Sequence, residues 1–376
     1  MRAINRVVDS GTYILGPEVE AFECEFAEFI GTRHCVLVAN GLDALQLALA
    51  AAGVGPGDEV IVPTQTFLAT LIAPLRLGAT VVTVDVHPVT GLIDVDRVAD
   101  AIGPKTAAVI PVHLHGAVVD MTSLGSLAKR NGLAVIEDAA QAHGAKTGDS
   151  MAGSLGLAGA FSFYPTKNLG ALGDAGCVTT DDPLLAAKIR SLRNYARSDY
   201  TDELPDLVGN SRTDEVQAAI LREMLPRLNQ WNESRRTSAS TYLAALQKRG
   251  LSGLAAGNDI DAANVFHHFA LLVPEREVVV KKLGLEGIQL LTHYSPLPHD
   301  ILKARLGFAG RKELIIHSAD GARFNAKHTV SLPLHPFLAT QEVHEVSRQL
   351  LAVVDDVASR RLLSLVRENS WSGSLP

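Results

Sequence analysis

The sequence predicts an α/β fold in which helices cover both faces of a mainly parallel β-sheet. Between residues 35 and 195, short apolar runs alternate with helical stretches, and this order is typical of parallel sheets with helical crossovers. The apolar runs are nearly continuous, which is the pattern of strands that are buried on both faces. The run Leu133–Ile136 ends abruptly in Glu137 and Asp138. A buried strand therefore delivers a carboxylate to the sheet edge where open α/β sheets bind ligands.

Local signals place the elements of this N-terminal part. Met1–Val8 is expected to form an amphipathic helix. Pro17, at a first-turn position, opens a helix with apolar residues at helical spacing, and Gly31 ends it. Further helices are expected at 42–52, 94–101, 121–131 and 183–195, and strands at 35–38, 59–63, 80–84, 106–112, 133–136 and 160–163.

The C-terminal part has longer expected helices and fewer strands. A helical stretch is expected from Asp214 to Arg249 with a break at Pro226, and a final helix from Thr340 to Arg367. Strands are expected at 265–273, 289–294 and 329–332, and a polar loop at 296–312. We divide the chain into a large domain, 1–228, which includes the N-terminal helices, and a smaller α+β domain, 229–376. No Gly/Ser/Pro-rich linker separates them.

Composition and charge exclude several classes of function. The formal net charge is −7 and no basic run is present, so nucleic acid is not an expected partner. The longest apolar region, 60–86, is interrupted by Pro63, Pro74 and Arg76, which predicts no membrane-spanning helix. The first residues lack the apolar segment of a signal peptide.

Cysteine and histidine spacing does not favour a metal site. Cys24, Cys35 and Cys177 lack ligand spacing, and their odd number is typical of reduced thiols. We therefore expect all three in the core and the protein in the cytoplasm. His113 and His115 alternate like a metal-binding pair, but no third ligand lies nearby in the sequence. We expect this pair to line a pocket at a strand end.

One acid and one amine follow two strand ends. Lys167 lies in the turn-rich loop Tyr164–Gly170, after the strand expected at 160–163. A lysine that forms an imine must lose its proton in each turnover, and burial beside a cofactor lowers its pKa. Pyridoxal phosphate needs such a lysine, and it needs a carboxylate such as Asp138 to keep its pyridine nitrogen protonated. The alternatives are that Asp138 caps the next helix and that Lys167 is solvated.

Two motifs around these residues carry a family resemblance. Glu137–Gly144 reads E-D-A-A-Q-A-H-G, and Ser162–Gly176 reads S-F-Y-P-T-K-N-L-G-A-L-G-D-A-G. The chain resembles the DegT/StrS-type sugar aminotransferases, which are fold type I pyridoxal-phosphate enzymes. The resemblance implies a mainly parallel, seven-stranded sheet sandwiched by helices, with a smaller α+β C-terminal domain. The roles that it implies are pyridinium binding by Asp138, a position near the cofactor's phenolic oxygen for Gln141, phosphate binding by Ser162 and the Schiff base at Lys167.

The resemblance implies further cofactor contacts. Gly41 and Leu42 begin a helix directly after a strand, and a helix N-terminus binds phosphate through backbone N–H groups. Phe67 matches an aromatic residue that stacks on the pyridine ring, with a core Phe as the alternative. The run G-L-D-A-L from Gly41 resembles the branch of the family that aminates dTDP-linked 3-keto-6-deoxyhexoses.

A third motif implies active sites shared between the subunits of a homodimer. Gly209–Ala219 resembles a G-x-N-S-R motif whose Asn reaches the cofactor phosphate of the other subunit. By this resemblance Asn210 binds the cofactor and Arg212 binds the substrate, both across the interface. The alternative is a helix N-cap at Thr213 with both residues solvated. The remaining candidates for substrate contact are Tyr13, His293 and Tyr294, and for the last two the alternative is packing of the small lobe.

The implied activity is transfer of an amino group from L-glutamate, or L-glutamine, to a nucleotide-linked ketosugar. A dTDP-3-keto-6-deoxyhexose is the expected acceptor, and the product is an amino sugar for natural-product or polysaccharide biosynthesis. Alternatives are a 4-keto nucleotide sugar, a cyclitol ketone and a non-catalytic cofactor-binding sensor or scaffold. A sugar dehydratase of the family carries His at the position of Lys167, so the lysine argues against that activity. An amino-acid/keto-acid transaminase is less expected, because we can assign no arginine to the second carboxylate of its substrate.

Overall fold

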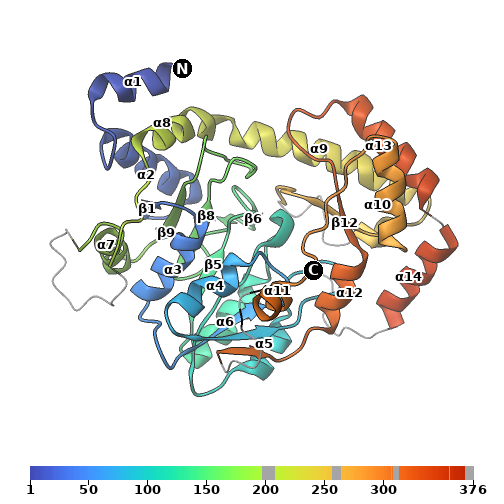
Figure 1. Ribbon diagram of the computed structural model, residues 1–376, viewed down its shortest axis with the longest axis horizontal. Coiled ribbons are helices and arrows are strands. Elements are labelled where there is room, and N and C mark those ends of the chain that lie inside the picture. Colours follow the sequence, from blue (N-terminus) through green and yellow to red (C-terminus); the bar gives the residue numbers. More distant parts are fainter. Residues whose placement is uncertain (197–207, 256–263, 306, 308–312, 355, 369–376) are drawn as a thin grey trace.

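The computed structural model describes residues 1–196, 208–255, 264–305, 307, 313–354 and 356–368 and confirms the α/β class. The strand order of its central sheet is β1-β9-β8-β5-β4-β2-β3-β11. Figure 1 labels β1, β9, β8 and β5 of this sheet, with helices around it. Neighbouring strands are parallel, except that β9 runs antiparallel to both β1 and β8. The bounds are β1 (His34–Val38), β2 (Glu59–Pro63), β3 (Thr80–Val84), β4 (Thr106–Val109), β5 (Ala134–Asp138), β8 (Ala158–Ser162), β9 (Gly176–Thr180) and β11 (Leu314–Ile316).

The sheet has eight strands among the described residues, so the expected number of seven is wrong by one. The additional strand, β11, comes from the C-terminal part and pairs in parallel with β3. Val81 N–H donates to Glu313 O over 2.8 Å, and His317 N–H donates to Thr83 O over 2.9 Å. An open edge at β3 would leave such groups unpaired, and β11 satisfies them. Its short length explains why the sequence pattern did not reveal it.

Helices cover both faces of this sheet, as the sequence predicts. Val60 packs in a core with residues of α3, α4 and α7, whereas its neighbour Ile61 packs in another core with residues of α5 and α6. Successive side chains of a strand point to opposite faces, so both faces of β2 are covered. The helices of this part are α1 (Arg2–Ser10), α2 (Pro17–Ile30), α3 (Gly41–Ala51), α4 (Ala69–Arg76), α5 (Val95–Ala101), α6 (Met121–Asn131), α7 (Pro183–Leu192) and α8 (Glu215–Met224).

Side-chain caps fix where several of these helices begin. Asn40 has extended backbone, and its Oδ1 accepts the N–H of Asp43 over 2.9 Å at the start of α3. Asp94 and Asp182 accept backbone N–H groups in the same way at the starts of α5 and α7. An N-cap satisfies donors that a helix cannot bond internally. The first turn of α3 is thereby held at the carboxyl end of β1.

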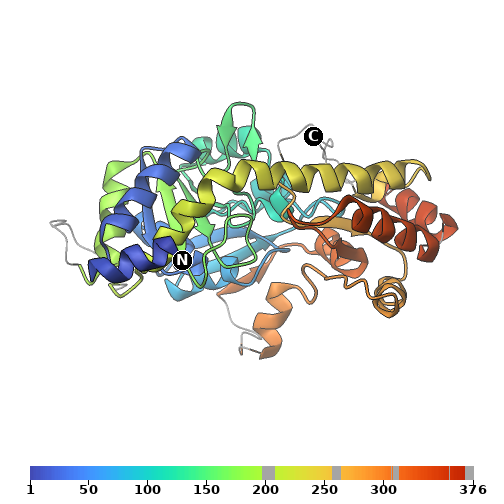
Figure 2. The same cartoon turned by 90° about the horizontal axis from the view of Figure 1, so that it is seen from above.

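The C-terminal part has its own apolar core, in which Tyr242, Phe266 and Phe269 are fully buried. The long helix α9 connects it to the sheet-containing part (Figure 2). The break expected at Pro226 is confirmed by a short 3₁₀ turn, Leu225–Arg227, between α8 and α9. The remaining elements are α9 (Leu228–Gln247), β10 (Phe269–Leu272), α10 (Arg276–Leu285), α11 (Pro298–Arg305), α12 (Asp320–His328), β12 (Thr329–Leu332), α13 (Thr340–Val353), α14 (Asp356–Glu368) and the hairpin of β6 (Lys146–Thr147) and β7 (Ser150–Met151).

Three C-terminal expectations are wrong. The strand expected at 289–294 is reduced to a single bridge between Leu291 and Ser331. The loop expected at 296–312 contains α11, which Pro298 opens at a position where its missing N–H has no cost. The final helix is two helices, because Val354 leaves the helical conformation and adopts extended backbone.

Cys24 is exposed, so the expectation that it lies in the core is wrong, whereas Cys35 and Cys177 are buried as expected. Within the described part of the chain, no helix is long and apolar enough to cross a membrane.

Candidate active site

The carboxyl ends of the parallel strands bring most of the predicted site residues to one edge of the sheet. β5 ends at Asp138 and β8 ends at Ser162, and Lys167 follows Ser162 by five residues. β1 leads into Gly41, and the loop after β2 carries Phe67. This edge is the usual ligand site of an open α/β sheet.

Asp138 is buried within a chain of hydroxyl groups. Thr70 Oγ1 donates to Asp138 Oδ2 over 2.8 Å, and Thr66 Oγ1 lies 2.8 Å from Thr70 Oγ1. Burial raises the pKa of Asp138, while the bond from Thr70 and the nearby charge of Lys167 act in the opposite direction. A cation placed against Asp138 would stabilise the ionised carboxylate, and a pyridinium N–H meets that need.

Lys167 lies at the same edge and is partly buried. Burial lowers its pKa to about 8, although the charge of Asp138 acts to raise it. The loop is closed by a bond from Lys167 N–H to Tyr164 O over 2.8 Å. A Cβ at Gly170 would lie 2.7 Å from Pro165 O, so this tight loop requires glycine there. The partial burial favours the imine-forming role over a solvated lysine, and an amine with this pKa is uncharged for part of the time near neutral pH.

A cradle that would fit a phosphate lies where α3 approaches β8. A Cβ at Gly41 would lie 2.7 Å from Ser162 Cβ, so the close approach requires glycine. The backbone N–H groups of Gly41 and Leu42 lie in the first turn of α3, where a helix lacks internal acceptors and attracts anions. The cradle, Asp138 and Lys167 together provide an anion site, a carboxylate and an amine. This donor set fits pyridoxal phosphate.

Gln141 links the cofactor edge to the C-terminal part. Its Oε1 accepts His115 N–H over 2.8 Å, and its Nε2 donates to Tyr294 Oη over 2.8 Å. The ring centroids of Tyr294 and Phe67 lie 6.1 Å apart. Phe67 is 59% exposed, so it is not a core residue. The structure therefore places Phe67, Gln141 and Tyr294 together at the mouth of the site.

Histidines that sequence reasoning did not group form one wall of the site. The rings of His268 and His293 are stacked with centroids 3.8 Å apart, and His115 Nδ1 lies 3.2 Å from His268 Nδ1. Burial, with the charge of Lys167 as a secondary cause, lowers the pKa of His293 to about 4. Burial likewise lowers the pKa of His115 to about 3. Both rings are therefore uncharged at neutral pH, and burial, not a charged histidine, lowers the pKa of Lys167.

His113 does not line this wall, so the expectation that both members of the pair line the pocket is wrong for it. Its Nε2 bonds to the fully buried Glu137 Oε2 over 2.8 Å. Glu137 also accepts the N–H groups of Gly153, Leu155 and Gly156. The two residues stabilise the loop before β8. No group of residues in the described ranges has the arrangement of a metal site.

Tyr13, Asn210 and Arg212 form a separate surface group near the start of α8. Tyr13 O accepts the N–H of Glu215 over 2.9 Å, and Arg212 Nη1 donates to Asn194 Oδ1 over 3.0 Å. Tyr13 is 52% exposed and Asn210 is also exposed. Thr213, the alternative N-cap, instead donates its hydroxyl to Val38 O, and Asp214 is the N-cap residue of α8. Ser211 Oγ, next to these candidates, accepts Ala39 N–H over 3.2 Å and donates to Asp43 Oδ2 over 2.8 Å, so the segment that carries Asn210 and Arg212 lies against the junction of β1 and α3.

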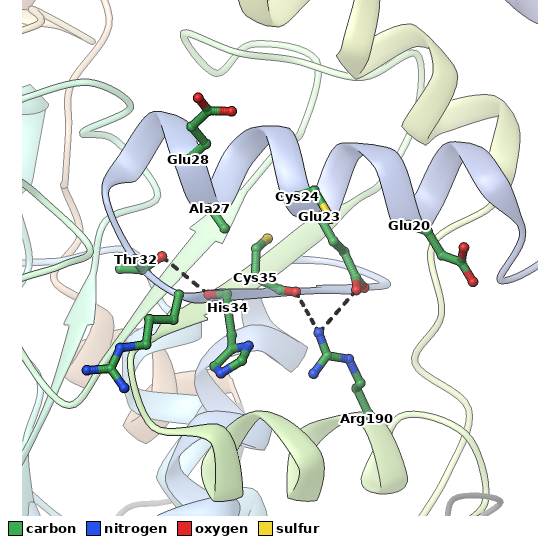
Figure 3. A pocket seen from close by; sticks show the side chains of 10 residues that line it. Glu20, Glu23, Cys24, Ala27, Glu28, Thr32, His34, Cys35 and Arg190 are labelled. Atoms are coloured by element: carbon green, nitrogen blue, oxygen red, sulfur yellow. Dashed lines mark hydrogen bonds and ion pairs between the residues drawn. The ribbon is translucent and has the colours of Figure 1, made fainter.

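A separate hollow of about 520 Å³ lies between α2, β1 and α7 (Figure 3). Arg190 Nη2 donates to Glu23 Oε2 over 3.4 Å and to Cys35 O over 3.3 Å, and Thr32 Oγ1 donates to His34 O over 3.3 Å. These polar groups bond to one another and hold α2 and α7 against β1. The hollow brings together none of the predicted catalytic residues.

The chain matches a known family over most of its length. The model of the DegT/DnrJ/EryC1/StrS aminotransferase family matches residues 1–351. A relative from Streptomyces venezuelae, dTDP-3-amino-3,4,6-trideoxy-alpha-D-glucose transaminase, is 44% identical over 357 residues, which are 94% of this chain and 90% of the relative.

Solved structures agree in fold. S. venezuelae DesV superposes with a TM-score of 0.85 at 44% identity, and the match covers 93% of this chain and 92% of DesV. Bacillus subtilis NtdA, solved with the bound cofactor PMP, has a TM-score of 0.83 at 29% identity, and the match covers 94% of this chain and 80% of NtdA. PMP is the aminated form of pyridoxal phosphate, the cofactor that the donor set fits. The chain therefore belongs to the DegT/DnrJ/EryC1/StrS aminotransferase family and is a pyridoxal-phosphate-dependent aminotransferase.

Proposed function

We propose that this aminotransferase transfers an amino group from L-glutamate to a dTDP-linked 3-keto-6-deoxyhexose, giving an amino sugar for natural-product or polysaccharide biosynthesis. The observation that carries the chemistry is a partly buried lysine with a pKa of about 8 beside the buried carboxylate of Asp138. The substrate class is supported by the similarity to the S. venezuelae transaminase, whose name specifies a 3-amino sugar linked to dTDP. The G-L-D-A-L sequence from Gly41 supports the same class.

Each residue of the site has a proposed role in holding the cofactor. Asp138 binds the pyridine nitrogen, and the N-terminus of α3 together with Ser162 binds the phosphate. Phe67, on the exposed rim, covers one face of the ring, and Gln141 lies beside its phenolic oxygen. Bonds to His115 and Tyr294 fix the orientation of the Gln141 amide.

Lys167 is proposed to move the proton at the reacting carbon. When bound, pyridoxal phosphate supplies an electron sink for negative charge that develops at that carbon. Lys167 Nζ, with its lowered pKa, accepts the proton and returns it. Asp138, through its bond from Thr70, keeps the proton on the pyridine nitrogen. The uncharged histidine wall leaves Nζ without a competing acid.

We further propose a homodimer with shared active sites. Asn210 and Arg212 are assigned to the partner's cofactor and substrate, and Tyr13 lies beside the segment that carries them. Exposed apolar side chains on neighbouring segments support an interface there; they are Tyr13, Ile14, Leu172, Tyr195 and Val208. We also propose a cytoplasmic location, which the free cysteines support. We propose the domain division between residues 228 and 229, which the start of α9 at Leu228 supports.

A half-reaction panel tests the substrate. The enzyme is converted to the form that carries the aminated cofactor, and one ketosugar at a time is added without amino donor. Rapid return of the visible absorption band with a dTDP-linked 3-keto sugar, and no return with 4-keto sugars or cyclitol ketones, supports the proposal. Return of the band with a 4-keto sugar or a cyclitol ketone, and not with the 3-keto sugar, assigns a different acceptor and leaves Asp138 and Lys167 in their roles. A matching panel of L-glutamate and L-glutamine identifies the donor.

A further inference from the structure

A buried amide network lies directly behind the loop that carries Lys167. The next residue, Asn168, is 4% exposed. Its Nδ2 donates to Asn232 Oδ1 over 2.9 Å and to Val265 O over 2.9 Å, and its Oδ1 lies 3.1 Å from His267 Nδ1. Asn232 and His267 are also buried. Three segments distant in the sequence therefore meet at one side chain.

Backbone carbonyls fix the direction of every bond in this network. A carbonyl only accepts, so the atom of Asn168 that faces Val265 O is the amide nitrogen. The same argument applies to Asn232, whose Nδ2 donates to His143 O over 2.9 Å. The oxygen of Asn168 therefore faces His267, and the hydrogen of that ring lies on Nδ1. Burial holds the pKa of His267 well below its usual range, so the ring is neutral and keeps this arrangement.

The network is anchored by α9, the helix that joins the two parts of the molecule (Figure 2). Arg235, one turn after Asn232, donates from Nη1 to Phe266 O over 3.2 Å and to His267 O over 3.4 Å. A Cβ at Gly144 would lie 3.1 Å from Asn232 Nδ2, so the close approach leaves little room. Helix α9 thus binds the side chain of Asn168 through Asn232 and the backbone at His267 through Arg235.

We propose that Asn168, Asn232 and His267 are positioning residues that hold Lys167 in its reactive place. The inference rests on the role proposed above for Lys167. Because the Lys167 backbone closes a tight turn with Tyr164, the neighbouring Asn168 side chain is the anchor that ties this turn to the interior. The network also ties the lysine loop to α9 and hence to the C-terminal part. Loosening it lets the loop shift and lets water reach Nζ.

The first experiment measures Lys167 directly, without cofactor. Acetic anhydride labels uncharged amines, and peptide mass spectrometry gives the labelling rate of Lys167 as a function of pH. We expect wild type to show a midpoint near pH 8. Asn232→Ala is expected to move the midpoint upward, because water stabilises the charged amine. Asn229→Ala is the matched control, since Asn229 is an exposed asparagine on the same helix. An unchanged midpoint in folded Asn232→Ala overturns the inference.

The second experiment uses the cofactor-loaded enzyme and a double-mutant cycle. We expect Asn168→Ala and Asn232→Ala each to lower kcat by roughly 10- to 100-fold, which is the usual scale for misplacing a reacting group. The double variant should lose little beyond the worse single variant, because the two residues share one bond. Additive losses contradict a common network. Asn229→Ala should stay within about twofold of wild type, as expected for a surface substitution.

A conservative pair at His267 keeps the inference testable if the alanine variants do not fold. Asn at this position can place an amide N–H near the site of Nδ1–H, whereas Leu removes the donor. We expect His267→Asn to retain most of the wild-type labelling midpoint and kcat, and His267→Leu to lose both. Equal behaviour of the two variants overturns the inference. The labelling midpoint does not depend on activity, so it tests the positioning network independently of the proposed function. Turnover by Lys167→Ala would contradict the proposed function.

Discussion

Replacement of Thr70 by Val tests how the protein controls Asp138. Thr70 has one hydroxyl hydrogen, and it donates that hydrogen to Asp138, so Thr66 must donate to Thr70. A hydrogen bond to a charged group contributes about 1.5–3 kcal/mol. If the full free energy of this hydrogen bond stabilises the transition state, Thr70→Val lowers kcat/KM by roughly 10- to 150-fold, because each factor of ten corresponds to about 1.36 kcal/mol. Valine keeps the shape of the side chain, so packing changes little.

The pH dependence gives the sign of the effect. The bond from Thr70 lowers the pKa of Asp138, so its loss raises that pKa and moves the acid limb of the kcat/KM profile to higher pH. Thr70→Ser keeps the hydroxyl and should stay within a few-fold of wild type, and Thr66→Val should have an intermediate effect because the donor to Asp138 remains. A Thr70→Val enzyme with the wild-type profile, or a Thr70→Ser enzyme equally impaired, would refute this reasoning.

Further predictions concern the lysine, the interface and the fold. Lys167→Ala should abolish the visible absorption band and turnover; a turning-over variant contradicts its role. The contribution of Lys167 to the free energy of unfolding should increase from pH 8 toward pH 10.5, because Lys167 has a lower pKa in the folded chain than in the unfolded chain and binds fewer protons there. A urea midpoint that falls over this range in the wild type, but not in Lys167→Met, would contradict this. Mixed subunits of Lys167→Ala and Asn210→Ala should regain part of the activity, whereas no recovery after confirmed subunit exchange argues against shared sites. Glu137→Gln should lower the free energy of unfolding by about 1–3 kcal/mol in urea titrations, because one of its buried acceptor positions becomes a donor; an unchanged midpoint would contradict that structural role.

The central chemistry could be predicted because it is local in the sequence. Asp138 directly ends a buried strand, and Lys167 lies in a loop only five residues after another strand-end residue, Ser162. The sheet topology then brings both strand ends to one edge without further information. Asn40 is likewise a local signal, since an N-cap explains why α3 begins at the cradle.

Residues whose roles depend on distant segments could not be predicted in the same way. His268 reaches His115 and His293 only because the C-terminal part folds back on the sheet. β11 completes an edge that no local pattern reveals. Thr70 was within reach of sequence reasoning, because Thr66 and Thr70 are four residues apart and follow β2, a parallel strand that ends at the same sheet edge as the acid.

Chemical trapping of the cofactor tests the central claim most directly. The purified protein is loaded with pyridoxal phosphate, reduced with sodium borohydride and digested, and the peptide that carries the phosphopyridoxyl group is identified by mass spectrometry. The structure predicts one dominant adduct, on Lys167, because its lowered pKa and the facing Asp138 favour reaction there. An adduct mainly on another lysine, or a protein that binds no cofactor, would contradict the account.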